Sequence, residues 1–119
     1  MNRITSIGAD LYRIPLPVTL TDSTHGAMTH FELVTARVVD GDGAEGTGYT
    51  YTVGANGHAI HATITHDLAP GLIGERADLI EALWQKMWWR LHYGGRGGAA
   101  TMAIAAIDIA LWDLKARYP

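Results

Sequence analysis

The chain has 119 residues, a formal net charge of −3 and no cysteine. This length suits one domain that buries roughly two-thirds of the surface its unfolded form exposes. Its nine lysine and arginine residues are scattered, so the chain lacks the basic stripe that a nucleic acid partner requires. The absence of cysteine excludes disulfides, a thiolate zinc site and a cysteine nucleophile.

The sequence has neither the pattern of a signal peptide nor that of a membrane span. Its first residues carry one positive charge with no long apolar run behind it. The longest apolar stretch, residues 102–114, contains Asp108 and Asp113 and is shorter than the ~20 residues that cross a bilayer. We therefore expect a cytoplasmic protein with no membrane partner.

The beginning of the chain predicts a strand and then a loop. Residues 4–16 favour a strand that ends at Pro15-Leu16-Pro17, because proline interrupts a β-ladder. Residues 18–30 are mostly Thr, Ser, Asp, Gly and His, without a helical or strand period. We expect this segment to be a loop.

Two further strands are predicted beyond this loop. Residues 31–40 alternate in polarity, and the apolar row predicts a strand with one buried side. The row consists of Val34, Ala36 and Val38, with the polar residues Glu32 and Asp40 at its ends. A tight-turn sequence follows at residues 40–43, and residues 45–53 again favour a strand. Together the three strands predict an antiparallel meander.

The next segments are helical in character. Residues 58–68 predict a helix that ends before Pro70-Gly71, and Asp78 is the predicted N-cap of the next helix, with Glu81 completing a capping-box arrangement. This second helix has a wide apolar stripe that we interpret as core. The stripe contains Leu79, Ile80, Leu83, Trp84, Met87, Trp88 and Leu91.

The last helix is predicted at residues 99–117, after a glycine-rich break at 94–98. It is apolar on nearly every face, and such a helix is normally buried on all sides. Exposing four of its large residues would cost roughly 6–12 kcal/mol, comparable with the ~5–15 kcal/mol that stabilise a whole domain. These residues are Ile104, Ile109, Leu111 and Trp112. We infer that a further domain or a second subunit covers part of the helix.

Strands at about residues 3–53 thus precede helices at about 57–117. This order predicts an α+β fold, a three-stranded antiparallel meander followed by a helical bundle, in one domain of residues 1–119.

Three motifs match known binding sites only in part. Gly41-x-Gly43-x-x-Gly46 has the dinucleotide-binding spacing, but a strand follows it instead of a helix whose N-terminus would face a pyrophosphate. Asp40 and Asp42 suggest a calcium loop, but Ala44 occupies the third ligand position. Residues 94–98 lack the Gly-Lys-Ser/Thr ending of a Walker site and are interpreted as a linker.

No catalytic or metal-binding residue is predicted from these patterns. His58 and His61 share a helix face but lack the carboxylate motif of a zinc helix. The one Ser–His pair lies in the predicted loop and has only Asp22 as an orienting carboxylate. Asp108 and Asp113 lie about 140° apart around their helix, so each is expected to make its own local hydrogen bond or salt bridge.

The last helix contains the sequence AAIDIALWDLKA at residues 105–116. It resembles the Ala-x-Asp-x-Ala-x-Trp-Asp signature of the mandelate racemase and muconate lactonizing branch of the enolase superfamily. Three other features occur in that family's order, namely Gly43-x-x-Gly46-x-Gly48-Tyr49, the Pro-Gly-Leu-Ile-Gly segment at 70–74, and the helix that carries Trp84. The resemblance covers the whole chain.

The resemblance implies a capping domain that packs on a modified TIM barrel, which is absent from this chain. In the family, two N-terminal loops cover the barrel mouth and set specificity. Here they correspond to residues 18–29 and 48–54. Their candidate substrate-binding residues are Ser23, Thr24, His25 and Gly26 in the first loop and Tyr49, Thr50 and Tyr51 in the second.

The implied chemistry is proton abstraction α to a carboxylate, with the base and Mg²⁺ held by the barrel. The isolated chain is therefore expected to bind no cofactor and to lack catalysis. The polar loop residues favour a small polyhydroxy acid, and hence an acid-sugar dehydratase or a racemase, because a cycloisomerase pocket is expected to be more apolar. The expected partners are the C-terminal barrel, in the same chain or a separate one, and further copies in a homo-oligomer. The alternative is a free-standing binding or oligomerisation module.

Overall fold

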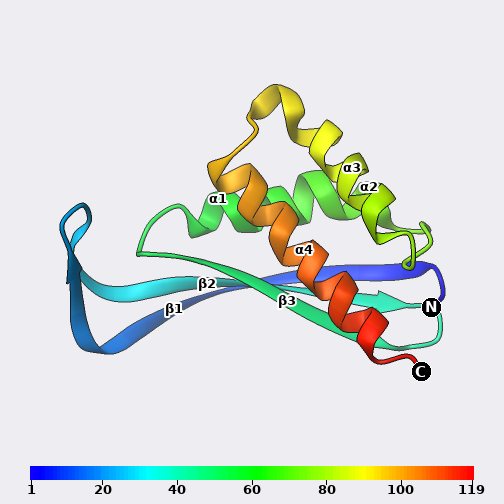
Figure 1. Cartoon of the computed structure of the whole chain (residues 1–119), viewed down its shortest axis with the longest axis horizontal. Helices are drawn as coiled ribbons and strands as arrows, with labels where there is room; N and C mark the ends of the chain where they lie inside the picture. Colours follow the sequence, from blue (N-terminus) through cyan, green and yellow to red (C-terminus); the bar gives the residue numbers. More distant parts are fainter.

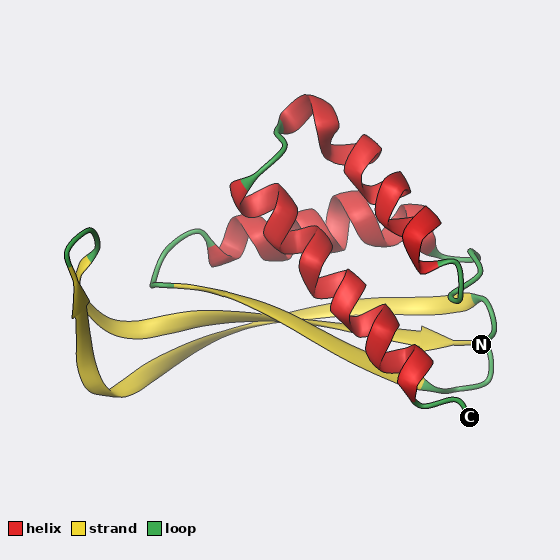
Figure 2. Cartoon of the chain, viewed as in Figure 1, coloured by secondary structure: helices red, strands yellow, loops and turns green.

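Three antiparallel strands form the sheet, in the order β1-β2-β3. The computed structural model describes all residues from 1 to 119. The strands are β1 (Ile4–Asp22), β2 (Gly26–Asp40) and β3 (Glu45–Thr52). All the helices lie on one side of this sheet (Figures 1 and 2). The predicted α+β class is confirmed.

The β1–β2 hairpin is longer than the sequence predicts. β1 continues through Pro15 and Pro17 to Asp22, so most of the predicted loop at 18–30 is strand. Two features accommodate the prolines: β1 is an edge strand, and the β1–β2 register shifts between Pro15 and Leu20. The end of this hairpin extends past the helical layer and bends, at the left of Figure 1. The loop prediction was therefore wrong except at the hairpin tip.

The helix-facing row of β2 matches its prediction. Its three apolar members are fully buried, and the two polar residues at its ends are 7% and 2% exposed. The apolar members are Val34, Ala36 and Val38, and the polar ends are Glu32 and Asp40. The row forms the sheet side of the core, which continues into the helices.

The first helical segment also runs further than predicted. It consists of α1 (Gly57–Ala62), the π-helix η1 (Thr63–Leu68) and α2 (Ala69–Leu72). Pro70 directly follows the π-helical turn, where Ala69 donates its N–H to the Ile64 carbonyl oxygen five residues back. The predicted end before Pro70 was therefore wrong.

The remaining helices are α3 (Ile80–Leu91), the short 3₁₀ helix η2 (His92–Gly94) and α4 (Gly98–Ala116). Asp78 does not cap α3, whose N-cap position is Leu79 without a side-chain hydrogen bond. Both Asp78 carboxylate oxygens instead accept hydrogen bonds from the Arg76 guanidinium, at 3.1 and 2.7 Å. The Arg76 guanidinium, which binds both carboxylate oxygens at once, thus takes the place of the helix N-terminus as the partner of Asp78.

Two glycines of β3 allow α4 to lie directly on the sheet. A Cβ atom at Gly46 would come within 2.0 Å of the Ala110 carbonyl oxygen, and one at Gly48 within 2.0 Å of the Ala106 carbonyl oxygen. No side chain fits in either place. Gly46 thus has a packing role, and the strand around it contains no helix N-terminus that could bind a dinucleotide.

The sheet and the other helices cover α4 only in part. Ile104 and Leu111 are buried, whereas Met102, Ile109 and Trp112 are 38%, 43% and 46% exposed. Of the four large residues that the sequence suggested would need a partner surface, Ile104 and Leu111 are therefore covered within this chain, whereas Ile109 and Trp112 are not. None of the helices is long and apolar enough to cross a membrane.

Candidate functional site

The tip of the β1–β2 hairpin is built around the carboxylate of Asp22. One carboxylate oxygen, Oδ1, accepts hydrogen bonds from the backbone N–H groups of Thr24, at 2.9 Å, and of His25. The other, Oδ2, lies 2.8 Å from Nδ1 of the His25 ring. Gly26 then starts β2 with φ +67°, a left-handed conformation that glycine adopts without strain. The turn therefore holds both the backbone and the imidazole of the tip.

The electrostatics of the tip favour a charged Asp22. The His25 backbone N–H, the His25 ring and the Thr24 backbone N–H together lower the pKa of the Asp22 carboxyl to about 2. The side chain of His25 is 55% exposed, and its Nε2 has no hydrogen-bond partner in the structure. The predicted residues Ser23, Thr24, His25 and Gly26 thus form one exposed polar group around an oriented imidazole.

The second set of predicted residues lies in a strand and not in a loop. Tyr49, Thr50 and Tyr51 belong to β3 and pair with Thr35, Val34 and Leu33 of β2. Because side chains alternate along a strand, both tyrosines project from the sheet face opposite the helices, whereas Thr50 shares the helix-facing row of Val34. The strand that the local pattern predicts at residues 45–53 is confirmed, whereas the loop at 48–54 that the resemblance implied is wrong, since β3 continues to Thr52.

The two predicted sets of residues do not form one cluster. Gly26 and Leu33, which pairs with Tyr51, are separated along β2 by about 23 Å at ~3.3 Å per residue. The Tyr51 ring instead stacks on Phe31, with ring centroids 5.2 Å apart. The tip and the tyrosines are therefore separate surfaces in this chain.

A buried carboxylate connects β2, β3 and the start of α1. Glu32 Oε1 accepts hydrogen bonds from the Thr52 hydroxyl at 3.0 Å and from the Gly57 backbone N–H at 2.9 Å. The Gly57 bond is the main reason that the pKa of Glu32 is lowered. The carboxylate also lies at the N-terminus of α1, where a negative charge is favourable. Glu32 thus anchors both ends of loop 53–56.

The base of the hairpin arm contacts the same loop through His30. The ring packs on Gly54, where a Cβ would lie 3.1 Å from His30 Nε2. Nδ1 lies 3.3 Å from the Arg13 guanidinium and from the Thr29 hydroxyl, and Nε2 is buried without a partner. Neither His30 nor Glu32 is assigned a functional role by the sequence patterns. The only available signal was a carboxylate in a row of buried strand residues.

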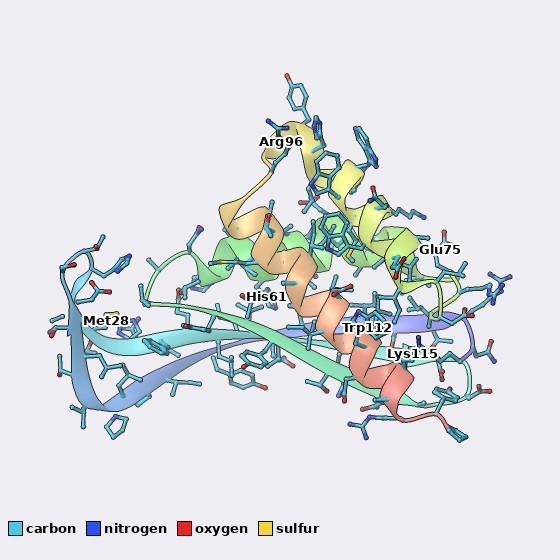
Figure 3. The ribbon with its side chains drawn as sticks, viewed as in Figure 1. Met28, His61, Glu75, Arg96, Trp112 and Lys115 are labelled. Carbon is cyan, nitrogen blue, oxygen red and sulfur yellow. The ribbon has the colours of Figure 1, made fainter.

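The other candidate residues have local partners or none. His61 Nε2 donates to the Ala9 carbonyl oxygen at 3.0 Å, which fastens α1 to β1 (Figure 3). Asp113 accepts a hydrogen bond from the Thr47 N–H at 2.7 Å and pairs with Arg117, so the prediction of a local partner is confirmed for Asp113. Asp108 has no hydrogen-bond partner, and burial raises its pKa. For Asp108 that prediction was wrong.

The chain does not itself provide a metal site. No group of three or more histidine or carboxylate side chains comes together in the structure. The side chains of this domain therefore do not by themselves form a ligand cluster for a metal ion.

Comparisons with known proteins identify the family. The sequence model of the mandelate racemase/muconate lactonizing enzyme N-terminal domain matches residues 6–119. A 3,6-anhydro-α-L-galactonate cycloisomerase from Streptomyces coelicolor is 62% identical over 119 residues, which cover 98% of this chain and 33% of the relative. An L-talarate/galactarate dehydratase from Salmonella typhimurium is 33% identical over 121 residues, covering 98% of this chain and 30% of the relative.

The fold agrees with that of a solved relative. The crystal structure of a racemase from Streptomyces coelicolor A3(2) with bound magnesium superposes with a TM-score of 0.91 at 62% identity, over 94% of this chain and 31% of that one. The chain thus spans about a third of the length of the relatives it matches. It belongs to the mandelate racemase/muconate lactonizing enzyme branch of the enolase superfamily, and it corresponds to the N-terminal domain of that family.

Proposed function

We propose that this chain is the capping and specificity domain of a Mg²⁺-dependent enzyme that abstracts a proton α to the carboxylate of a sugar acid. The observation that carries the proposal is the hairpin arm, which extends beyond the helices and ends in an oriented imidazole with two hydroxyl side chains beside it. These groups make hydrogen bonds with the hydroxyls of a polyhydroxy acid. Acid, base and metal ligands belong to the rest of the parent enzyme, so the isolated chain lacks catalysis.

The substrate contacts are assigned first to the tip, through Ser23, Thr24, His25 and Gly26. Tyr49 and Tyr51 are secondary candidates on the outer face of the sheet. Thr50 projects from the opposite face, so one ligand cannot contact all three of these β3 side chains. We therefore expect substitutions at the tip to affect specificity more than substitutions in β3.

The names of the relatives support a sugar acid as the substrate class, since one acts on anhydro-galactonate and another on talarate and galactarate. Both a dehydratase and an isomerase remain candidates for the reaction. The relative with 62% identity is a cycloisomerase, which favours the isomerase side. The polarity of the tip does not distinguish a dehydratase from an isomerase, because a cycloisomerase that acts on a sugar acid also binds a hydroxylated substrate.

The uncovered side of α4 is the surface on which we propose that the C-terminal barrel domain packs. One face of the helix there carries Met102, Ala105, Ile109 and Trp112. These residues follow one another at alternating spacings of three and four positions, as along the seam of a coiled coil. Two adjoining hollows between α3 and α4 share Trp112 as a lining residue. Trp112 and Lys115 mark this side of the helix in Figure 3. The greater length of the relatives supplies a domain to cover it.

A second candidate is a free-standing oligomerisation module. It is favoured by the outer face of the sheet, where Tyr12, Leu33 and Tyr51 are paired neighbours on three strands. Tyr12 and Tyr51 are 49% and 50% exposed, and exposed apolar patches of this kind often form protein interfaces. This candidate predicts a defined oligomer of the 119-residue chain in light scattering, whereas the capping-domain proposal requires none.

The capping-domain proposal is tested with a fused enzyme, made by joining this chain to the C-terminal two-thirds of the Streptomyces coelicolor cycloisomerase. Turnover of 3,6-anhydro-galactonate and of galactarate is measured with Mg²⁺ for the fused enzyme and for each part alone. We expect activity from the fused enzyme and none from the 119-residue chain. Activity of the chain alone, or a folded fused enzyme that turns over neither sugar acid, would contradict the proposal.

A further inference from the structure

The two oxygens of the Asp22 carboxylate have separate tasks. Oδ1 accepts the backbone N–H groups of Thr24 and His25, which fixes the turn. Oδ2 is left to the imidazole and lies 2.8 Å from its Nδ1. Asp22 therefore holds the His25 ring and also fixes the backbone of the turn to which His25 belongs.

The chemistry of a carboxylate determines where the ring proton lies. An aspartate has an ordinary pKa near 3.9 and is ionised at neutral pH, and the hydrogen bonds within the turn keep it so. An ionised carboxylate only accepts hydrogen bonds, so Nδ1 of His25 must carry the hydrogen. A neutral imidazole has one such hydrogen, and Nε2 is then a lone-pair acceptor.

We propose that Asp22 is a positioning residue that holds the neutral His25 ring in its Nδ1–H form, so that the hairpin tip presents Nε2 as an acceptor for a ligand hydroxyl. The ligand class rests on the proposed function, whereas the state of the ring does not. An acceptor at this place selects the hydroxylated part of a sugar acid. A carboxylate, which also only accepts, gains no hydrogen bond from the neutral ring.

His30, in the same hairpin, provides an opposite case. Its Nδ1 lies 3.3 Å from the Arg13 guanidinium, which only donates hydrogen bonds. Nδ1 of His30 must therefore accept, and the ring hydrogen lies on Nε2. Two histidines of one hairpin are expected to hold opposite tautomers, each set by the charged side chain beside it.

The tautomers are measured on the 119-residue chain by nitrogen-15 NMR of the imidazole rings, at a pH of about 9, above the range in which imidazole titrates. We expect the Nδ1–H form for His25 and the Nε2–H form for His30. Free histidine prefers the Nε2–H form in water, so an unconstrained His25 would resemble His30. That result for the unmodified chain would overturn the proposal without any variant.

Asp22→Asn sharpens the test. The asparagine keeps an oxygen for the two backbone N–H groups and places an NH₂ donor against Nδ1, so His25 should change to the Nε2–H form. Ser23→Ala, at a side chain without a hydrogen bond in the structure, is the matched control and should leave both rings unchanged. The Thr24 and His25 amide signals report whether the turn is intact. An unchanged His25 tautomer in an intact Asp22→Asn turn would show that Asp22 does not set it.

The ligand part of the proposal is measured separately in the fused enzyme. Loss or reversal of one neutral hydrogen bond should raise KM for the sugar acid about 2- to 10-fold in Asp22→Asn, with kcat little changed. Thr65→Ala, at an exposed position of η1 outside the hairpin, is the control for the Asp22 substitution in this measurement. If the NMR result holds but neither Asp22→Asn nor His25→Ala alters KM, the tautomer stands and the proposed substrate contact is wrong.

Discussion

The α4–β3 interface and the hairpin tip are organised in opposite ways. At the interface, two glycines bring backbone against backbone, and no atom can be added without moving the helix. At the tip, one turn holds an exposed group of polar side chains, and the nearest buried cluster lies at the base of the arm. The comparison indicates that stability is concentrated in the first region, which leaves the second free to vary in sequence and thus in ligand preference.

The largest effect should come from adding one methyl group at the interface. Gly46→Ala places a Cβ about 2 Å from a backbone carbonyl oxygen of α4, which neither element can avoid without separating. We expect the free energy of unfolding to fall by at least about 3 kcal/mol in urea denaturation. Gly94→Ala, where a Cβ meets nothing within 4 Å, is the control and should change it by less than about 1 kcal/mol.

Glu32 lies between the two regions, and its removal should have the next largest effect. Glu32→Ala leaves the Thr52 hydroxyl and the Gly57 N–H without their acceptor, and we expect the melting temperature to fall by roughly 5–10 °C. Thr65→Ala, at an exposed position of η1, should change it little. A melting temperature equal to that of the Thr65 variant would show that Glu32 does not anchor loop 53–56.

Protonation of the Glu32 carboxylate determines the direction in which the stability of the chain changes with pH. The pKa of Glu32 is lowered in the folded chain, so its contribution to stability is fully present above the ordinary glutamate pKa of about 4.3 and is lost as the pH falls through the lowered value. Thermal unfolding of the unmodified chain and of Glu32→Gln should therefore differ most at neutral pH and converge in acid. A difference that grows on acidification would contradict this assignment.

A smaller effect is expected on the exposed side of α4. Ile109→Ser changes a side chain that is 43% exposed and should alter the unfolding free energy of the 119-residue chain by less than about 1 kcal/mol. In the fused enzyme, the same change should cost about 1–2 kcal/mol, because the barrel domain would cover the residue. Tyr93→Ser, at a fully exposed side chain, is the control for both proteins. Equal effects of Ile109→Ser in the two proteins would argue against docking at α4.

The smallest effect on stability should come from the tip itself. Ser23→Ala removes an exposed hydroxyl that makes no hydrogen bond, and its denaturation curve should overlay that of the unmodified chain.

The turn should persist well into acid, because the Asp22 pKa is lowered to about 2 and its bonds are lost only as the pH falls through that value. Amide signals of Thr24 that disappear near pH 4 would contradict this.

The sequence predicts the first region far better than the second. Alternation in β2 identifies the buried row at Val34, Ala36 and Val38, and the apolar composition of residues 99–117 identifies α4, because both are local patterns. The prolines were misleading at the hairpin arm, since a register shift on an edge strand accommodates them. Local composition does not reveal whether a strand has a free edge.

The candidate site was predicted only as far as its members are close in sequence. Residues 23–26 form one turn, as expected from neighbours along the chain. Tyr49 and Tyr51 were placed in a loop by the family resemblance alone, although the local pattern already favoured a strand over residues 45–53. Glu32 was not assigned because its donors come from residues 20 and 25 positions away. Long-range pairing of this kind has no local sequence signal.

The most direct test of the specificity role compares two histidine variants of the fused enzyme. His25→Ala removes the imidazole of the tip, and His66→Ala removes an exposed imidazole from the helical layer. The ratio of kcat/KM for 3,6-anhydro-galactonate and galactarate is measured with the Mg²⁺ affinity. We expect His25→Ala to change this ratio about 10-fold or more at unchanged Mg²⁺ affinity, and His66→Ala to change neither. Equal ratios in the two variants, or a loss of Mg²⁺ affinity in His25→Ala alone, would contradict it.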